Sequence, residues 1–462
     1  MSSLTPEQQS ANARFSPPVA TASTATHPVA EHAGAHGGGA AAAQAHGGHG
    51  GGGGLGLRNL RTFSSFKFAP FRWFYASMVS QMAAMQVEMI ARGLLIYAIT
   101  HSATMLGWMA VAQSIPMLAA SFGGGVMADR IQKKHLMVFG MGANALIALG
   151  VAVAITFGLI AEGAPWAIAI LLIASVAKGA VQGLIMPARQ SIIPELVGRE
   201  QIMNALALNN LGMNVLRILA PAGAGFAVAL WGYESAYYVM TALFAAATLF
   251  ALRLPRTSVA AVKGRAVADL VDGFKYLGRQ PTVALVLFFT LFAVLLSMPY
   301  MQMLPIFTES VLHVGPEGMG ILVMISGIGA VVGSLVLASL PNRYRGLMLV
   351  VSSLIMGVAL TVFSFSTTFT VSALAIIFVG IGQTGRMTLA GTLLQHYVDD
   401  EYRGRVMAIY MMEFGLTSLS VLLAGILADR IGIQWSIGGM ALALIAVSAF
   451  VLVASPRLRR LH

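Results

Sequence analysis

Six ionisable side chains lie within long apolar stretches of the sequence, where a charge is energetically costly. A charged residue at the centre of a membrane-spanning helix costs roughly 2.5–3.5 kcal/mol on insertion scales, so each one is a candidate for function. Carboxyl groups in such a setting can take up and release protons. The six residues are Glu88, Arg92, Lys178, Arg217, Arg386 and Glu413. Their types suggest the handling of protons or of a substrate inside a membrane.

Glu88 and Glu413 are the candidate proton carriers among them. Gln81, Glu88 and Arg92 follow one another at steps of seven and four, which places them on one helical face. Glu88 and Arg92 are also i,i+4 neighbours, so the alternative for Glu88 is a self-neutralising pair that only lowers the cost of insertion. Glu413 has no basic residue within one turn of its own helix. Its alternative is a structural pairing with Arg386 or Arg217 from another helix.

Further polar residues outline a candidate substrate cavity. Lys178 and Gln182 are i,i+4 neighbours, and Gln383 and Arg386 are i,i+3 neighbours at the matching place in the second half of the chain. We expect them, with Gln81 and Arg92, to face a cavity or each other.

One later stretch is both polar and rich in small residues. Asn210, Asn214 and Arg217 form a stripe that can hydrogen-bond neighbouring helices. It is followed by a run of small residues from Ala220 to Gly225 that contains Pro221. Because proline removes a backbone hydrogen bond, we expect a bend or hinge there.

Composition requires a bilayer around the elements that carry these residues. The 462 residues are 57% hydrophobic and 10% charged, with a mean hydropathy of +0.78. From Phe71 onward, twelve segments can cross about 30 Å of hydrocarbon. They span residues 72–99, 104–128, 136–160, 165–187, 203–230, 234–253, 282–308, 318–340, 346–365, 369–393, 405–428 and 434–454. We therefore predict an all-α integral membrane protein.

The basic residues give the orientation of these segments. With a cytoplasmic N-terminus, the Lys and Arg residues outside the spans fall in cytoplasmic segments, Arg430 excepted. This asymmetry is the positive-inside pattern, so the net charge of +11 leaves no basic patch for nucleic acid. We predict a multi-pass protein of the bacterial cytoplasmic membrane, in contact with the lipid bilayer, with both termini in the cytoplasm.

Five regions follow from these patterns. Residues 1–60 form a disordered tail rich in His, Gly and Ala, 61–254 and 282–456 each form a six-helix bundle, and 457–462 form a basic tail. The linker 255–281 alternates charged and apolar residues over 269–277, which predicts an amphipathic helix on the inner membrane surface. The chain has no cysteine, and we expect no metal site and no cofactor. The histidines of the tail are expected to be solvated, with incidental metal affinity, at His27, His32, His36, His46 and His49.

A charged loop ends the second span. Gly125-x-x-x-Asp129-Arg130 is followed by Gln132, Lys133 and Lys134. Gly425-x-x-x-Asp429-Arg430-x-Gly432 ends the eleventh span in a similar way, as inverted repeats would.

These residues resemble the major facilitator superfamily, whose loop between the second and third helices has the form Gly-x-x-x-Asp-Arg-x-Gly-Arg/Lys-Arg/Lys. The segment from Ala220 to Gly225 resembles the Gly-Pro-x-x-Gly-Gly motif of its antiporters. The segment 187–197, with Asn204 and Arg217, is similar to drug and siderophore exporters of the macrolide-efflux and enterobactin-exporter type.

The resemblance implies a twelve-helix, two-bundle carrier with alternating access and proton antiport. It also implies that the Asp129 loop latches the two bundles at the cytoplasmic side. Asp129 thereby joins the proton-coupling candidates, and the latch and hinge residues are Gly125, Asp129, Arg130, Lys133, Arg217, Pro221 and Gly225. One departure from the family's motifs weakens the case for proton coupling. The fourth-helix motif Arg-x-x-Gln-Gly is matched at Gln182 and Gly183, but Gly179 stands in place of the arginine.

Together, the residues and the family resemblance favour a monomeric exporter of a small amphiphilic or lipophilic compound, with protons as its second partner. A lipid or lysophospholipid flippase of the same fold is the alternative. A membrane-embedded enzyme would need a nucleophile with its base, or a ligand cluster, inside the spans, and the sequence offers none. A sensor would be expected to carry a signalling domain, and none is recognisable.

Overall fold

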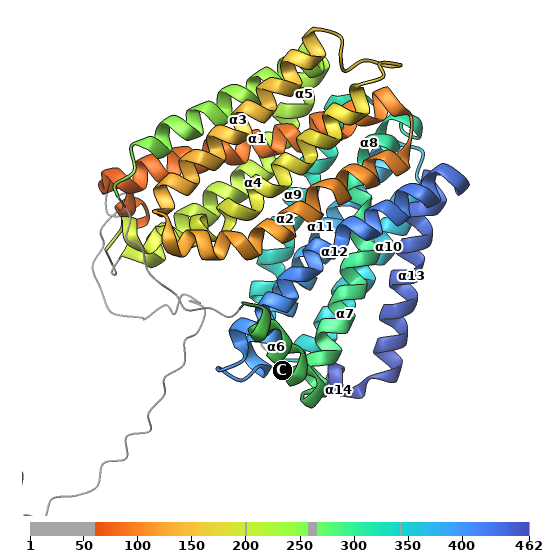
Figure 1. Ribbon diagram of the computed structural model, residues 1–462. Helices are drawn as coiled ribbons and strands as arrows, with labels where there is room; N and C mark the ends of the chain where they lie inside the picture. The colour runs from red at the N-terminus through yellow and green to blue at the C-terminus, as the bar shows by residue number, and fades with distance from the viewer. Residues whose placement is uncertain (1–60, 199–200, 257–265, 342, 462) are drawn as a thin grey trace, which may run out of the picture. The chain divides into compact units, whose positions relative to one another are not determined.

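The computed structural model describes residues 61–198, 201–256, 266–341 and 343–461, and only the backbone of residues 61–63, 122–130, 187–188, 190–191 and 266–269. The predictions for the N-terminal tail therefore lie outside the described residues. All regular secondary structure in the described part is helical (Figure 1). This agrees with the all-α prediction.

The described part of the first half contains a short 3₁₀ helix and five α-helices. They are η3 (Arg61–Lys67), α1 (Ala69–Thr100), α2 (Ala103–Arg130), α3 (Lys133–Thr156), α4 (Ala167–Leu196) and α5 (Ile202–Leu252).

Helix α5 consists of two membrane spans joined at Gly232. The helix has 51 residues. A straight helix of that length would extend about 76 Å, which is far more than one crossing requires. Gly232 has φ 76° and ψ 176°. This backbone conformation is open to glycine and strained for other residues. The chain reverses there, so α5 supplies the fifth and sixth predicted spans.

The second half begins with a helix outside the apolar spans. The helices are α6 (Ala266–Arg279), α7 (Pro281–Ser297), α8 (Pro299–Ser310), α9 (Pro316–Ser339), α10 (Arg345–Phe365), α11 (Phe369–Tyr397), α12 (Arg403–Ile431), α13 (Ile433–Ala454) and α14 (Pro456–Arg459). Pro299 lacks a backbone N–H and interrupts the helical ladder. Even so, α7 and α8 together form one apolar span, Pro281–Ser310.

Eleven helical stretches in the described part are long and apolar enough to cross a membrane. Because α5 counts once among them and is divided at Gly232, they correspond to the twelve predicted segments. The amphipathic helix predicted over 269–277 is present as α6, and Tyr276 on it stacks on Tyr402 with ring centroids 4.4 Å apart.

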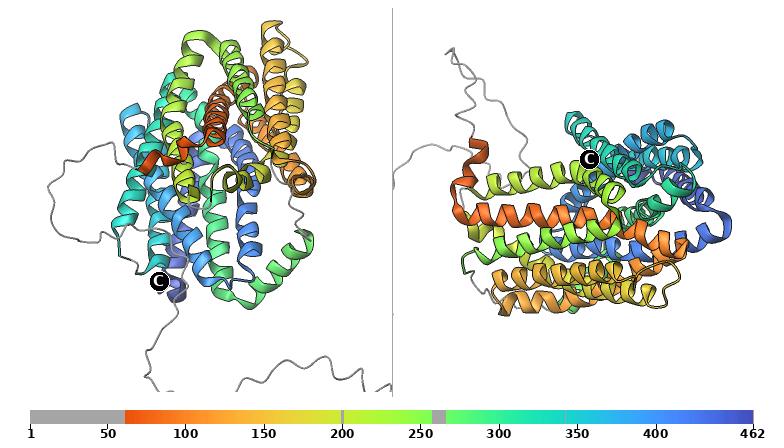
Figure 2. Two further views of the ribbon diagram at one scale, coloured as in Figure 1. Left: turned by 90° about the vertical axis from the view of Figure 1, so that its left-hand side faces the viewer. Right: turned by 90° about the horizontal axis from the view of Figure 1, so that it is seen from above.

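The described residues from Arg61 to Leu461 pack as one unit in which each half forms its own bundle. In the first half α1 packs on α5, α2 on α4, and α3 on α4 and α5. In the second half α11 packs on α9 and α10, and α13 packs on α10 and α12. The two bundles meet mainly through α2 with α12 and α5 with α9 (Figures 1 and 2).

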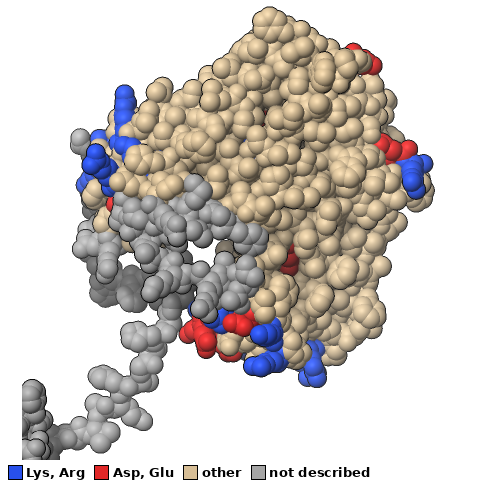
Figure 3. Space-filling model, in the orientation of Figure 1, with Lys and Arg blue, Asp and Glu red and all other residues tan. Residues whose placement is uncertain are grey.

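The surface of the described part is suited to lipid. Large apolar side chains are exposed on or next to several helices, among them Phe157, Leu146, Leu230 and Phe450, each about 70% exposed. Apolar faces of this extent are not stable in water. Most charged side chains lie at the edges of the face in Figure 3, and the broad surface between them is almost entirely uncharged.

Candidate functional site

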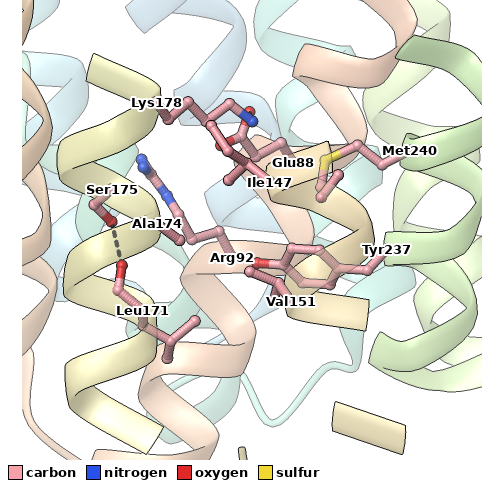
Figure 4. A pocket seen from close by; sticks show the side chains of 11 residues that line it. Glu88, Arg92, Ile147, Val151, Leu171, Ala174, Ser175, Lys178, Tyr237 and Met240 are labelled. Carbon is pink, nitrogen blue, oxygen red and sulfur yellow. Dashed lines mark hydrogen bonds and ion pairs between the residues drawn. The ribbon is translucent and has the colours of Figure 1, made fainter. Parts of the chain in front are cut away.

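The first bundle holds a buried charged cluster built from four helices. The carboxylate of Glu88 on α1 forms an ion pair with the ammonium group of Lys178 on α4. Arg92, one turn after Glu88, donates to the amide oxygen of Gln113 on α2. Tyr237 of α5 lines the same small pocket (Figure 4). Glu88 therefore pairs across helices rather than with Arg92 on its own helix.

This cluster is nearly closed. Its cavity is about 20 Å³. That is room for about one water molecule. The lysine charge compensates Glu88, so removing either partner would leave an uncompensated charge in a dry setting. The geometry is that of a structural ion pair with little space for a larger molecule.

The second bundle holds a cluster that is not compensated. One carboxyl oxygen of Glu413 on α12 accepts a hydrogen bond of 2.8 Å from the hydroxyl of Thr290 on α7. Its other oxygen has no hydrogen-bond partner among the described residues. Arg386 on α11 is 0% exposed, and all three of its guanidinium nitrogens lack a described partner.

Arg386 and Glu413 are close enough for their charges to interact, although they form no ion pair within the described part of the chain. Tyr410, one turn before Glu413, is also near both, and its hydroxyl has no described partner. Gln383 of α11 is buried in the same bundle, and its amide donates weakly to the sulfur of Met298 at 3.8 Å. These groups thus keep unused hydrogen-bonding capacity within the described part of the bundle.

A third polar region lies between the two bundles. Asn214 and Arg217 of α5 face Ser334 of α9 and Thr384 and Thr388 of α11 across a cavity of about 200 Å³. Arg217 was predicted as part of the hinge, and the structure places it on the wall of this cavity.

The two bundles are fastened together at one end, which we call the closed end. Asp429, near the last turn of α12, accepts hydrogen bonds from the hydroxyl of Ser102 at 2.8 Å and from the backbone N–H groups of Ala103 at 2.8 Å and Thr104 at 2.9 Å. Helix α2 begins at Ala103, so a carboxylate of the second bundle caps a helix of the first.

Small residues allow the close approach at the closed end. A methyl group at Gly225 of α5 would lie 2.3 Å from the carbonyl oxygen of Pro316 on α9, and one at Gly320 would lie 2.5 Å from that of Pro221. A methyl group at Gly425 of α12 would lie 2.4 Å from the carbonyl oxygen of Ala103. The bundles diverge away from this end in Figure 1.

The sequence profile of the Major Facilitator Superfamily matches residues 73–416 and 301–461. The chain belongs to this superfamily. It is 25% identical over 356 residues to the staphyloferrin A transporter of Staphylococcus aureus, covering 75% of this chain and 87% of the relative. It is 23% identical over 373 residues to macrolide efflux protein A of Streptococcus pyogenes, covering 78% and 90%.

The enterobactin exporter of Citrobacter koseri is 25% identical over 323 residues, covering 68% of this chain and 74% of the relative. Among solved structures, the nucleoside transporter NupG superposes with a TM-score of 0.69 at 14% identity, covering 84% of this chain and 100% of that one. A bacterial homolog of the human lysosomal transporter Spinster, inward-facing and unoccupied, gives 0.66 at 14% identity, covering 87% and 98%. The family and these relatives make the chain a membrane transporter and not an enzyme.

The residues predicted as latch and hinge in this superfamily member lie on α2, α3 and α5. Gly125, Asp129 and Arg130 lie in the last turns of α2, where only the backbone is described, so the loop's latch function stays a prediction. Lys133 forms an ion pair with Glu195 at the end of α4, within the same bundle. The non-helical dihedral angles within α5 fall at Gly232 and not at Pro221, whose role as a hinge also stays a prediction.

The two glutamines predicted for the substrate cavity in the first bundle, Gln81 and Gln182, do not line the pocket of its charged cluster. Gln81 is 1% exposed, and both of its amide atoms lack a described partner. Gln182 is half-buried on α4. Sequence reasoning missed Gln113, Thr290, Tyr410 and Thr384, because single hydroxyl or amide groups in apolar spans carry no signal of their partners.

Proposed function

We propose that this transporter exports a small amphiphilic or lipophilic compound of the drug or siderophore type, and that the inward flow of protons drives it. The relatives support export, because they include a macrolide efflux protein and an enterobactin exporter that match this chain over most of their length. The environment of Glu413 is the main support for proton antiport. This carboxyl is buried, holds one hydrogen bond, and has an unpaired guanidinium nearby.

The proposed cycle uses two arrangements of this cluster. When Glu413 is protonated, it is neutral and stays with Thr290, while Arg386 is unpaired. When the proton leaves, the carboxylate can turn its free oxygen to Arg386 and form an ion pair. Opposite charges attract strongly in a buried site, so each protonation state favours a different packing of α11 against α12.

Glu88 and Asp129 are the weaker proton candidates. Glu88 is already compensated by Lys178, which favours a structural role for this pair. Asp129 and Arg130 would hold the opposite ends of the bundles together in the other state of the cycle, as the closed end is held here by Asp429.

The charges of the described residues support an orientation. Near the closed end the acidic residues are Glu162, Glu234, Glu309, Glu317 and Asp429, whereas the basic one is Arg430. Lysine and arginine gather at the opposite ends of the helices. By the positive-inside rule the closed end would face outward, so this conformation would be open to the cytoplasm, with both termini there.

The test is proton release from acid-loaded proteoliposomes with the cytoplasmic face outward. Addition of a transported drug or siderophore should alkalinise the lumen as the compound enters. Glu413→Gln should abolish this signal but retain exchange of labelled compound for unlabelled. The matched control is Glu162→Gln, because its carboxylate is exposed at a loop, and it should behave as the wild type.

Two outcomes would overturn parts of this proposal. Normal proton-linked uptake by Glu413→Gln would remove Glu413 from the coupling step. Movement of labelled lysolipid that ignores the pH gradient, with no response to soluble compounds, would favour the flippase alternative. The groove between α10 and α11, about 510 Å³, is lined by apolar side chains.

A further inference from the structure

The cavity between the bundles has one ionisable side chain on its wall. Arg217 of α5 lines it together with neutral residues of α5, α9 and α11. Within the described part of the chain, Arg217 forms neither an ion pair nor a hydrogen bond through its side chain. An arginine in the middle of a membrane-spanning helix normally has a compensating partner.

Neutral donors surround this cation. Asn214 is one turn before Arg217, and Thr384 and Thr388 are i,i+4 neighbours on the facing helix α11. Many hydroxyls in the spans donate to a carbonyl of their own helix, as Thr361 does to Gly357 at 2.9 Å. The side chains of Asn214, Thr384 and Thr388 make no hydrogen bond with any described residue, so their donors are free.

The rest of the wall is apolar. Ile218 of α5, Ala330 and Val331 of α9 and Met387 of α11 line the same space. Methionine and branched aliphatic side chains adapt to apolar bodies of varied shape. The cavity thus combines a cation, free neutral donors and an apolar wall, with no carboxylate among its lining residues.

We infer that the cavity binds an amphiphilic organic anion, whose carboxylate is held by Arg217 and whose apolar part lies against Ile218 and Met387. The inference rests on the proposed export function and specifies its substrate class. A guanidinium binds a carboxylate through two parallel N–H donors, which a neutral or cationic group cannot accept in the same way. The same charge repels organic cations, so they would be discriminated against at this position.

The first test is binding to the purified full-length protein in detergent. Three probes share one shape and differ in charge, namely 2-naphthoate (anion), 2-naphthamide (neutral) and 2-naphthamidine (cation). Binding is measured as the ligand-dependent rise in unfolding temperature, followed by tryptophan fluorescence at constant ionic strength. We expect naphthoate to bind at least about tenfold more tightly than naphthamide, as a charge-assisted hydrogen bond implies, and naphthamidine to bind most weakly.

Substitutions then assign the preference to Arg217. Arg217→Gln should weaken naphthoate binding about tenfold and leave naphthamide unchanged, whereas Arg217→Glu should reverse the order and favour naphthamidine. Arg343→Gln is the matched control, because it removes the same charge from an exposed position outside the cavity. Size-exclusion profiles and unfolding temperatures without ligand show whether each variant is folded, and the charge reversal gives a gain of binding that misfolding cannot produce.

The outcomes separate this inference from the proposed function. Equal binding of naphthoate and naphthamide, or unchanged naphthoate binding in Arg217→Gln, would overturn the anion site even if proton-linked export is found. Intact naphthoate selectivity without proton-linked transport in liposomes would leave the anion site in place and overturn the antiport instead.

Discussion

The hydrogen bonds of Asp429 should control how often the closed end of the transporter opens. Its carboxylate receives three hydrogen bonds across the closed end, from Ser102, Ala103 and Thr104, and two of the donors are the first backbone N–H groups of α2. Removing an N-cap side chain costs about 0.5–2 kcal/mol in ordinary helices. The side chain is exposed, so screening by water lowers the value, and we take about 1 kcal/mol for Asp429→Ala. These bonds join the two bundles, so their loss should destabilise the conformation in which this end is closed. The population in which it is open should then rise about fivefold.

The assay is the distance between two spin labels at the closed end. The chain has no native cysteine, so Glu162→Cys on the first bundle and Thr367→Cys on the second can be labelled without a background signal. In Asp429→Ala the long-distance population should increase relative to the wild type, and in Asp429→Asn it should increase less, because asparagine also caps helices.

The control for this prediction is Arg430→Ala, which removes the neighbouring charge and none of the three hydrogen bonds. It should leave the distance distribution unchanged. If Asp429→Ala gave the same distribution as the wild type, the three hydrogen bonds would not be holding the bundles together, and the reasoning would be refuted.

Two further predictions concern the buried charges. Glu88→Gln or Lys178→Met alone should destabilise the protein by about 3–5 kcal/mol, whereas the double variant should recover most of that loss, because both charges of the pair are then absent. Thermal unfolding of the four proteins measures this, and a double variant as unstable as the sum of the singles would argue against a paired role. Arg386→Met should raise the unfolding temperature, because it replaces a buried guanidinium without a described partner by an apolar side chain, and it should abolish proton-linked transport. A lower unfolding temperature in this variant would show that the guanidinium stabilises the folded protein and would refute this reasoning.

The membrane spans could be predicted closely from hydropathy. The span predicted over 369–393 is α11, Phe369–Tyr397, and the one over 434–454 is α13, Ile433–Ala454. The prediction for α4 stopped at 187 although the helix continues to Leu196, because polar residues such as Glu195 can extend a helix beyond the hydrocarbon. Hydropathy marks the bilayer thickness and not the helix end.

Partners of the buried charges could not be predicted in the same way. Periodicity showed that Glu88 and Arg92 share a face, but their contacts with Lys178 and Gln113 depend on which helices are neighbours in the bundle. The same is true of Thr290 beside Glu413, 123 positions away in the chain. A single sequence gives the chemistry of each helix but not the packing order of the bundle.

Helix α11 connects the proposed proton site with the proposed anion site. Arg386 is buried toward Glu413, whereas Thr384 and Thr388 line the cavity between the bundles. Successive residues of a helix are about 100° apart, so Arg386 is about 200° from each threonine and lies on the opposite face. A change of charge at Glu413 that draws in Arg386 would therefore rotate or shift the wall that carries the two threonines. Arg217, on the opposite wall of the cavity, belongs to the other bundle. The shift of α11 would therefore change the affinity for an anion although the anion and the proton bind at separate sites. We therefore expect naphthoate affinity to depend on pH in the wild type and to be independent of pH in Glu413→Gln over the same range.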